Sequence, residues 1–395
     1  MKQLPLDGIR IIDFTWILAG PYATRILADF GAEVIKIQSE KIATGTELNT
    51  SPEFATWNRN KLGITLNMDH PEARELVLKL VSISDVVIQN FSSRVIENWG
   101  LTYEVIKKVN PAIIMLNLSG MGMTGPWKNY VALSDTVEAL SGLTYLSSYD
   151  KVNSTVIGYA HSDIVAGLFS TLAILSALEH RRLTELGQYI DISEFETTCA
   201  LLGPAILNFT TSNHIPFPQG NKTDYINAAP YGCYKCLGND KWCVIAVFND
   251  AQWFQLCRIM GEPQWTQQSR FCTIAKRKKY KKAVDKHIEE WTSRQAPAKM
   301  MQLLQDSHIP YSIVNNIQDL DNNSHLQQRN SFVSQSHPVL GMVKMDSTPL
   351  KLSRTPFSLR KAAPLIGEDN IYVFQNMLGM DYGTIMQYIK KGIIG

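Results

Sequence analysis

The stretch GIRIIDFTWILAGPYATRILADFGAEVIKI, residues 8–37, determines the fold class. Apolar residues dominate at 8–14 and again at 33–37, which predicts two buried strands. Between them a helix is predicted from Pro21 to Phe30, because proline suits the first turn of a helix. A strand–helix–strand unit of this length implies parallel strands joined by a right-handed crossover. No G-x-G-x-x-G follows the first strand, so the sequence does not predict a dinucleotide site.

Strands and helices continue to alternate along the chain. Residues 71–82 predict a helix. Further strands are predicted at residues 62–66, 85–88, 111–117 and 189–192. This alternation predicts an α/β fold with a mostly parallel sheet and flanking helices. In such sheets ligands bind beyond the carboxyl ends of the strands, where Trp16 and Asn90 fall. The polar, turn-rich residues 40–56 predict a surface loop.

The composition excludes several classes of protein. Charged residues make up 19% of the 395 residues and the formal net charge is +2, so we expect neither nucleic acid nor an acidic membrane as the main partner. No run of 18 apolar residues occurs, and the N-terminus lacks an apolar signal core, so neither a membrane span nor export is expected. We therefore expect a cytoplasmic protein whose six cysteines are free thiols.

Two short motifs receive simple interpretations. Cys233 and Cys236 have the spacing of zinc and redox sites, but no second pair follows, and structural zinc needs four ligands. The sequence therefore predicts no metal site. The basic run from Lys276 to Lys282 predicts a solvated helix face.

A second stretch, GYAHSDIVAGLFSTLAILSALEHRRLTELGQYIDISEFE at residues 158–196, predicts a turn, a helix, a turn and a strand. The helix is apolar on nearly every face, so we expect it to be buried in a core. Asp163 lies where the turn becomes the helix. An aspartate in this place is usually an N-cap that accepts hydrogen bonds from the first free amides, and this is the simplest interpretation of Asp163.

The same stretch also resembles a known family. The patterns G-x-x-x-x-D-x-x-A-G, A-L-x-x-R and G-Q-x-x-D-x-S, together with D-G-I-R-I-I-D-F, A-G-P and G-A-E-V-I-K-I near the N-terminus, resemble those of the family III CoA-transferases. Formyl-CoA transferase and carnitine CoA-transferase are members. The resemblance extends from Leu6 to about Glu368.

The resemblance implies an architecture. We expect a large domain in residues 1–211, a Pro-, Asn- and Gly-rich linker in residues 212–228, and a smaller α/β domain in residues 229–325 that begins with a hairpin. Residues 326–395 are expected to return to the large domain. Two such chains would interlock like rings into a homodimer.

The resemblance also implies a function and a site. Asp163 would be the nucleophile of an acyl-CoA:carboxylate CoA-transferase that works through aspartyl anhydride and aspartyl-CoA thioester intermediates. The partners would be an acyl-CoA donor and a carboxylic acid acceptor, with no metal and no permanently bound cofactor. Leu18 and Asp135 would line the substrate pocket. The implied coenzyme A contacts are Trp16, Ile17, Ala19, Leu66, Asn90, Phe91 and Arg94.

Departures from the family pattern leave alternatives open. Formyl-CoA transferase has basic residues on CoA at positions that match Ser39, Asp69, Asn98 and Ala132. Either the phosphate site is built differently here or CoA binding is weak. Leu18 replaces a polar glutamine and the glycine-rich flap has no equivalent, so formate–oxalate exchange is not expected. Residues 229–242 are more similar to relatives that act on benzylsuccinate and other aryl or branched acids.

Two other functions remain possible at this point. An α-methylacyl-CoA racemase on the same fold needs a histidine and an aspartate as paired bases, but Leu133 occupies the expected histidine position and His161 lies too close to Asp163 in sequence to replace it. A catalytically silent subunit of a hetero-oligomeric transferase is the other alternative; the missing basic contacts favour it and the retained Asp163 opposes it.

Overall fold

The computed structural model describes residues 4–45, 47–220 and 227–395, and it divides into two compact units. The first unit comprises Met1–Thr144, Val156–Pro216 and Gln327–Gly395, and the second comprises Tyr145–Thr155 and Phe217–Leu326. Residues 145–155, which the sequence assigns to the large domain, thus group with the second unit. The expected linker, residues 212–228, includes residues 221–226, which lie outside the described residues.

A six-stranded parallel sheet forms the centre of the first unit, counted over the described residues. Its strands are β1 (Arg10–Asp13), β2 (Glu33–Gln38), β3 (Lys61–Thr65), β4 (Val86–Gln89), β5 (Ile114–Ser119) and β6 (Tyr189–Ser193). The order β3-β2-β1-β4-β5-β6 confirms the predicted parallel α/β sheet. The chain runs outward from β1 to β3 and then returns to β4 beside β1, so the strand order reverses between β1 and β4. At such a point the crossover loops diverge and leave a crevice beyond the carboxyl ends.

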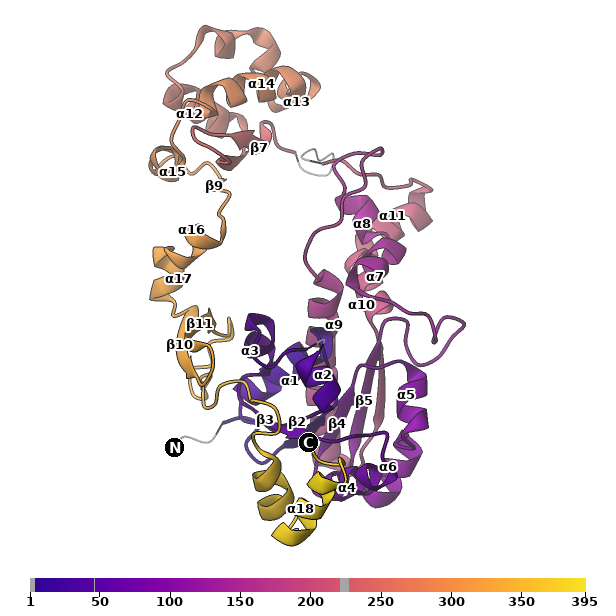
Figure 1. The fold of residues 1–395 in the computed structure, drawn as a ribbon. Coiled ribbons are helices and arrows are strands. Elements are labelled where there is room, and N and C mark those ends of the chain that lie inside the picture. Colours follow the sequence, from indigo (N-terminus) through magenta and orange to yellow (C-terminus); the bar gives the residue numbers. More distant parts are fainter. Residues whose placement is uncertain (1–3, 46, 221–226) are drawn as a thin grey trace. The chain divides into compact units, whose positions relative to one another are not determined.

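Helices cover both faces of this sheet because neighbouring strand residues point to opposite sides. On one face Ile11 belongs to an apolar core with α1 (Ala19–Asp29) and α9 (His161–Thr184). On the other face Ile12 belongs to a second core. The helices of that second core include α4 (Pro71–Ser82), α5 (Ser93–Asn98), α6 (Tyr103–Val109) and α18 (Tyr382–Lys390) (Figure 1). Asn370 and the carbonyl of Gly395 bond to Thr65, which fixes the C-terminal segment on β3.

The expectation that the 161–184 helix is buried on all sides is wrong for the single chain. Ala166, Ile174 and Ala177 of α9 are fully buried against the sheet and α1. On its other side Leu172 is 61% exposed and Leu168 is 48% exposed. Among the described residues α9 is the one helix long and apolar enough to cross a membrane, but a core helix packed on a sheet passes the same test.

Residues 40–56 do not form the simple surface loop that their polarity predicts. They contain α2 (Glu40–Thr44) and the start of α3 (Pro52–Asn58), each capped by the serine before it. Glu47 and Asn49 between the two helices are buried and hydrogen-bonded to Gln38 of β2. Polarity here reflects an internal network rather than contact with water.

Further elements complete the first unit. They are α7 (Ser134–Ser141), α8 (Leu143–Ser147), which ends within the second unit, α10 (Glu194–Leu201), α11 (Gly203–Ser212), the antiparallel pair β10 (Phe332–His337) and β11 (Gly341–Asp346), and a π-helix (Tyr372–Met377).

The second unit contains an antiparallel sheet whose described strands are β7 (Tyr231–Lys235), β8 (Trp242–Ala246) and β9 (Tyr311–Ile313). The predicted hairpin is therefore confirmed as β7–β8. Its helices are α12 (Asp250–Ile259), α13 (Ile274–Lys279), α14 (Lys281–Thr292), α15 (Pro297–Gln305), α16 (Ile317–Asp321) and α17 (Ser324–Gln328), the last of which ends within the first unit. Short 3₁₀ turns occur at Gln264–Gln267 and Ser269–Phe271.

Two sequence interpretations concern this unit. The basic run is not wholly solvated, because Arg277 is fully buried and pairs with Asp250. The described residues contain no group of three or more His, Cys, Asp or Glu side chains that could hold a metal ion. Burial raises the pKa of the Cys236 thiol.

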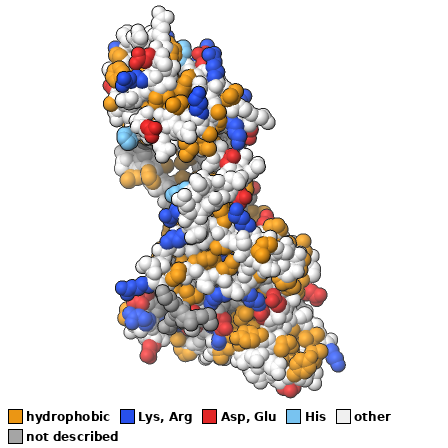
Figure 2. Space-filling view, turned by 90° about the vertical axis from the view of Figure 1, so that its left-hand side faces the viewer, with side chains coloured by type: hydrophobic (Ala, Val, Ile, Leu, Met, Phe, Trp, Pro, Cys, Tyr) orange, Lys and Arg blue, Asp and Glu red, His pale blue; other side chains and the backbone are white. Residues whose placement is uncertain are grey.

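Figure 2 shows one face of the molecule, on which cationic and anionic side chains are interspersed, in keeping with the small net charge.

Candidate active site

A pocket of about 690 Å³ lies in the first unit beyond the carboxyl ends of β1, β4 and β5, where the strand order reverses. It brings together most of the site residues predicted from sequence: Trp16, Ile17, Leu18, Ala19, Asn90, Phe91, Arg94, Asp135 and Asp163. Leu66 does not join them. It is 1% exposed in the core formed with α4 and α18 and is not among the described residues that line the pocket.

Asp163 is not the N-cap of α9, so the simplest interpretation from sequence is wrong. The N-cap is Ala160, and Asp163 belongs to the first helical turn. The free amides are capped instead by Glu138 of α7, whose Oε1 accepts hydrogen bonds from the amides of His161 (2.9 Å) and Ser162 (3.4 Å). Because another carboxylate caps the helix, Asp163 is left to line the pocket.

Two helix N-termini meet at the Asp163 carboxylate. Interactions with its own amide, with the amide of Ala19, which begins α1, and with Ser134 each act to lower the pKa of the Asp163 carboxyl group. Helix N-termini carry partial positive charge and stabilise anions. Burial nevertheless raises the pKa of Asp163 above its ordinary value, and the donors offset only part of that effect. Burial and the neighbouring donors thus act in opposite directions on the pKa of this one carboxyl group.

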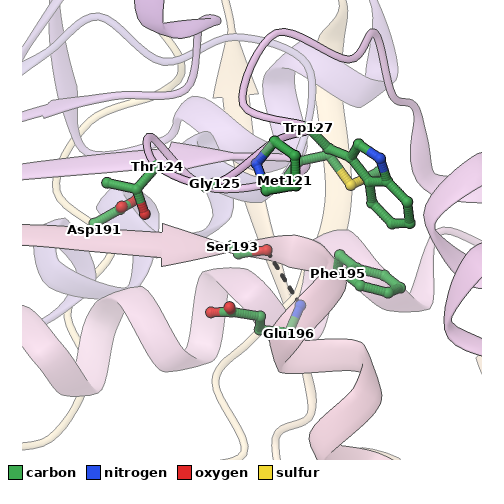
Figure 3. A pocket seen from close by; sticks show the side chains of 10 residues that line it. Met121, Thr124, Gly125, Trp127, Asp191, Ser193, Phe195 and Glu196 are labelled. Atoms are coloured by element: carbon green, nitrogen blue, oxygen red, sulfur yellow. Dashed lines mark hydrogen bonds between the residues drawn. The ribbon is translucent and has the colours of Figure 1, made fainter.

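Glu194 is a site residue that the sequence analysis missed. It is 8% exposed, lines the same pocket and is hydrogen-bonded to Asp163. Ser193 Oγ accepts a hydrogen bond from the amide of Glu196 at 3.2 Å (Figure 3). Ser193 thereby caps α10, which begins at Glu194. Burial, reinforced by the Asp163 charge, raises the pKa of Glu194 to about 8. The rule that ligands bind at strand ends could have found it, because Glu194 directly follows β6.

The loop between β1 and α1 forms one wall of the pocket and is held by Asn90. The Asn90 side chain accepts a hydrogen bond from the Trp16 amide (2.9 Å) and donates one to the Trp16 carbonyl (2.9 Å). The Trp16 ring stacks on Phe91 with centroids 6.0 Å apart. Ile17 has a φ of 64°, a left-handed conformation that is rare for a β-branched residue. Backbone strain of this kind persists only where surrounding contacts enforce it.

Buried ion pairs next to this loop help to hold its conformation. Lys61 Nζ lies 3.0 Å from Asp13 Oδ2, and both side chains are fully buried. Lys36 Nζ lies 3.4 Å from Glu47 Oε2, and Glu47 Oε1 accepts from the Ile17 amide at 3.1 Å. Burial lowers the pKa of Lys61 to about 8. Burial raises the pKa of Asp13, but the two lysines and neighbouring hydroxyls bring it below its ordinary value.

Comparison with known proteins identifies the family. The model of CoA-transferase family III matches residues 6–370. The chain belongs to CoA-transferase family III.

Curated relatives of the transferase include enzymes from Chloroflexus aurantiacus. Succinyl-CoA–D-citramalate CoA-transferase is 29% identical over 99% of this chain and 98% of its own. The alpha subunit of succinyl-CoA–L-malate CoA-transferase is 30% identical over 100% of this chain and 93% of its own. Among solved structures, a CAIB/BAIF family protein from Brucella suis superposes with a TM-score of 0.88 at 28% identity, covering 95% of this chain and 100% of that one.

The transferase has few cations at its pocket. Arg94 and Lys128 line it, and both are exposed. Lys128 was not predicted, since it lies in a polar loop without a recognisable period. Leu133 also lines the pocket and is 66% exposed. His161 is exposed, with Nδ1 3.2 Å from the Tyr159 carbonyl oxygen, and is not among the described pocket residues.

Proposed function

We propose that this family III CoA-transferase moves CoA between an acyl-CoA donor and a carboxylic acid acceptor through covalent intermediates on Asp163. The observation that carries the proposal is the Asp163 carboxylate itself. It is partly buried, lies between the N-termini of α1 and α9, and lines a pocket at the switch point of the sheet. No metal is required, because each step exchanges one acyl bond for another.

The proposed reaction conserves the activation of the thioester. An Asp163 oxygen attacks the thioester carbonyl, the carbon–sulfur bond breaks, and CoA leaves as a thiolate from a mixed anhydride. The thiolate attacks the Asp163 carbonyl, and the donor acid departs as a carboxylate from the resulting aspartyl-CoA thioester. The acceptor carboxylate attacks this thioester and expels the thiolate, which then attacks the acceptor carbonyl and regenerates Asp163. Covalent catalysis divides one difficult step into easier ones.

Succinyl-CoA is the proposed donor. The printed names of the two Chloroflexus relatives both specify succinyl-CoA. For the acceptor we propose an organic acid with an apolar body, because Trp16, Leu18 and Phe91 line the pocket and ligand pockets match the polarity of what they bind. Arg94 and Lys128 are the proposed contacts of the CoA phosphates.

We further propose a homodimer. The exposed apolar side of α9, with Leu168 and Leu172, supports it, because an apolar patch of this kind is typical of protein interfaces. A hetero-oligomer is the alternative, since one relative is an alpha subunit. Addition of a partner chain would then be needed for activity.

The racemase alternative is disfavoured by geometry. Racemisation needs two bases on opposite faces of the α-carbon. Glu194 is hydrogen-bonded directly to Asp163 and so lies on the same side, and the expected histidine position is Leu133.

A substrate panel tests the proposal. The purified protein is mixed with succinyl-CoA and free acids, among them citramalate, malate, glutarate and benzylsuccinate, in deuterated water, and the CoA esters are identified by mass spectrometry. Formation of a new CoA ester without deuterium at its α-carbon supports a transferase. Deuterium incorporation without exchange would establish a racemase, and exchange that appears only with a second chain would establish a hetero-oligomer.

A further inference from the structure

We propose that Glu194 is a second catalytic residue, which stays protonated beside ionised Asp163 and donates a hydrogen bond to the Asp163 oxygen that becomes negatively charged during thiolate attack. This inference rests on the proposed function. It goes beyond that function in assigning a role to a carboxyl group that the anhydride route does not require.

The geometry of the pair requires a proton. Glu194 and Asp163 line one pocket and are hydrogen-bonded through their side chains. Two carboxylates have only acceptor oxygens, so a direct hydrogen bond between them exists only when one of them is protonated. At 8% exposure, Glu194 gains little from water if it ionises.

The surrounding donors decide which group keeps the proton. Interactions with Ser134, with the Ala19 amide and with its own amide each lower the pKa of Asp163 and so favour its anion. For Glu194, burial raises the pKa to about 8 and the charge of Asp163 acts in the same direction. No described lysine or arginine forms an ion pair with Glu194. The charged and titratable groups on the elements around it are Asp135 and Glu138 of α7, His161 and Asp163 of α9, Glu196 of its own helix, and Arg94 and Lys128 across the pocket.

The protonated carboxyl then serves in the second step of the reaction. When CoA thiolate attacks the Asp163 carbonyl of the anhydride, a carbon–sulfur bond forms and negative charge appears on an Asp163 oxygen. Glu194 and Ala19 line the same pocket as this group, and the interaction of each with it acts to lower its pKa. The electron pair on this oxygen then re-forms the carbonyl double bond as the anhydride carbon–oxygen bond breaks, and the donor acid leaves as a carboxylate that carries the negative charge. Glu194 keeps its proton throughout, so the step balances. Donors fixed at a developing oxyanion contribute strongly to catalysis.

Kinetics over about pH 6 to 10 test the role of Glu194. We expect Glu194→Ala to lower kcat by about 100-fold, as the loss of one oxyanion donor does elsewhere. Glu194→Gln keeps a donor that cannot ionise, so it should retain kcat within a few-fold and lose the fall in activity that the wild type shows above about pH 8. Glu196→Gln, on the same helix, should match the wild type. Wild-type kcat in Glu194→Ala, or an unchanged alkaline fall in Glu194→Gln, would overturn the inference.

Infrared difference spectroscopy locates the proton without turnover. The wild type should show a protonated carboxyl band near neutral pH that Glu194→Gln lacks. In Asp163→Asn this band should titrate at lower pH, because the like charge is gone. A wild-type band that Glu194→Gln leaves intact contradicts the proton assignment. Absence of CoA exchange by the wild type overturns the proposed function, whereas an active wild type with a fully active Glu194→Ala overturns this inference alone.

Discussion

Asn90 holds both backbone groups of Trp16, accepting from its amide and donating to its carbonyl, each at 2.9 Å. This single side chain links the carboxyl ends of β1 and β4 across the point where the strand order reverses. Asn90 therefore fixes the loop from Trp16 to Ala19, which forms the wall of the pocket beside Asp163.

Replacement of Asn90 by alanine should lower kcat about 10- to 100-fold, because small misplacements of a positioning loop have effects of this size. The matched control is Asn110, which also bonds to backbone groups through its side chain, but away from the pocket. Asn110→Ala should lower the melting temperature without a selective loss of kcat. Steady-state kinetics and thermal melts of both variants measure this, and equal effects on activity would contradict the assignment.

Asp163→Ala and Asp163→Asn should abolish CoA exchange while melting near the wild-type temperature. An amide or methyl group cannot form the anhydride. Mass spectrometry after incubation with acyl-CoA should detect an adduct on wild-type protein and none on either variant. Asp306→Asn, which alters an exposed acid at the end of α15, is the control and should remain fully active. Turnover in either Asp163 variant would refute the nucleophile.

Arg94→Ala and Lys128→Ala should each raise the KM for acyl-CoA roughly tenfold, which corresponds to about 1.4 kcal/mol of binding. Each removes a cation that lines the pocket. The effect should shrink in high salt, since exposed charges are screened. Lys108→Ala removes an exposed cation of α6 outside the pocket and should leave the KM unchanged. An unchanged KM in both pocket variants would place the phosphates elsewhere.

Lys61→Met should destabilise the fold by about 3–5 kcal/mol, because it leaves the fully buried Asp13 carboxylate without its cation. The double variant Asp13→Asn/Lys61→Met should recover part of this loss. Denaturant unfolding of the three variants measures the coupling.

The contribution of Lys61 to the free energy of unfolding should also depend on pH. Its pKa falls from 10.5 to about 8 on folding. Between these values the unfolded chain binds more protons at this site than the folded chain, so Lys61 makes stability rise with pH across the window. The gap in unfolding free energy between wild type and Lys61→Met should widen from about pH 8 to about pH 10.5. A gap that narrows over this range would contradict the lowered pKa of Lys61 in the folded chain.

Leu172→Glu should convert the proposed homodimer into monomers, because it puts a charge on the exposed apolar side of α9. Val152→Glu changes a residue that is 87% exposed and should leave the dimer intact. Light scattering with size-exclusion chromatography gives the masses. A monomeric wild type would refute the dimer.

Sequence patterns predict the sheet well and the interior of the site poorly. Strands such as residues 85–88 are recognisable because β4 is buried on both faces and therefore continuously apolar. Lys36 and Lys61 lie within similar strands, yet nothing local indicates that their partners are Glu47 and Asp13. Buried polar pairs depend on contacts between distant segments, which a local period does not encode.

The same reason explains Asp163 and Glu194. A first-turn aspartate resembles an N-cap until Glu138, from a different helix, is seen to bond the free amides. Glu194 follows a strand like many surface acids, and only the packing of α10 on α7 and α9 brings it to Asp163. The family resemblance pointed to Asp163, whose role as nucleophile stays a prediction, and did not point to Glu194.

The meeting of α1 and α9 at one carboxylate has a consequence for biosynthesis. Ala19 is synthesised early, whereas Asp163 follows after five strands of the sheet and Glu194 after the sixth. The proposed nucleophile and its neighbouring carboxyl group are therefore both present only when roughly half of the chain has been made, once the last strand of the sheet has been completed and the helix after it has begun.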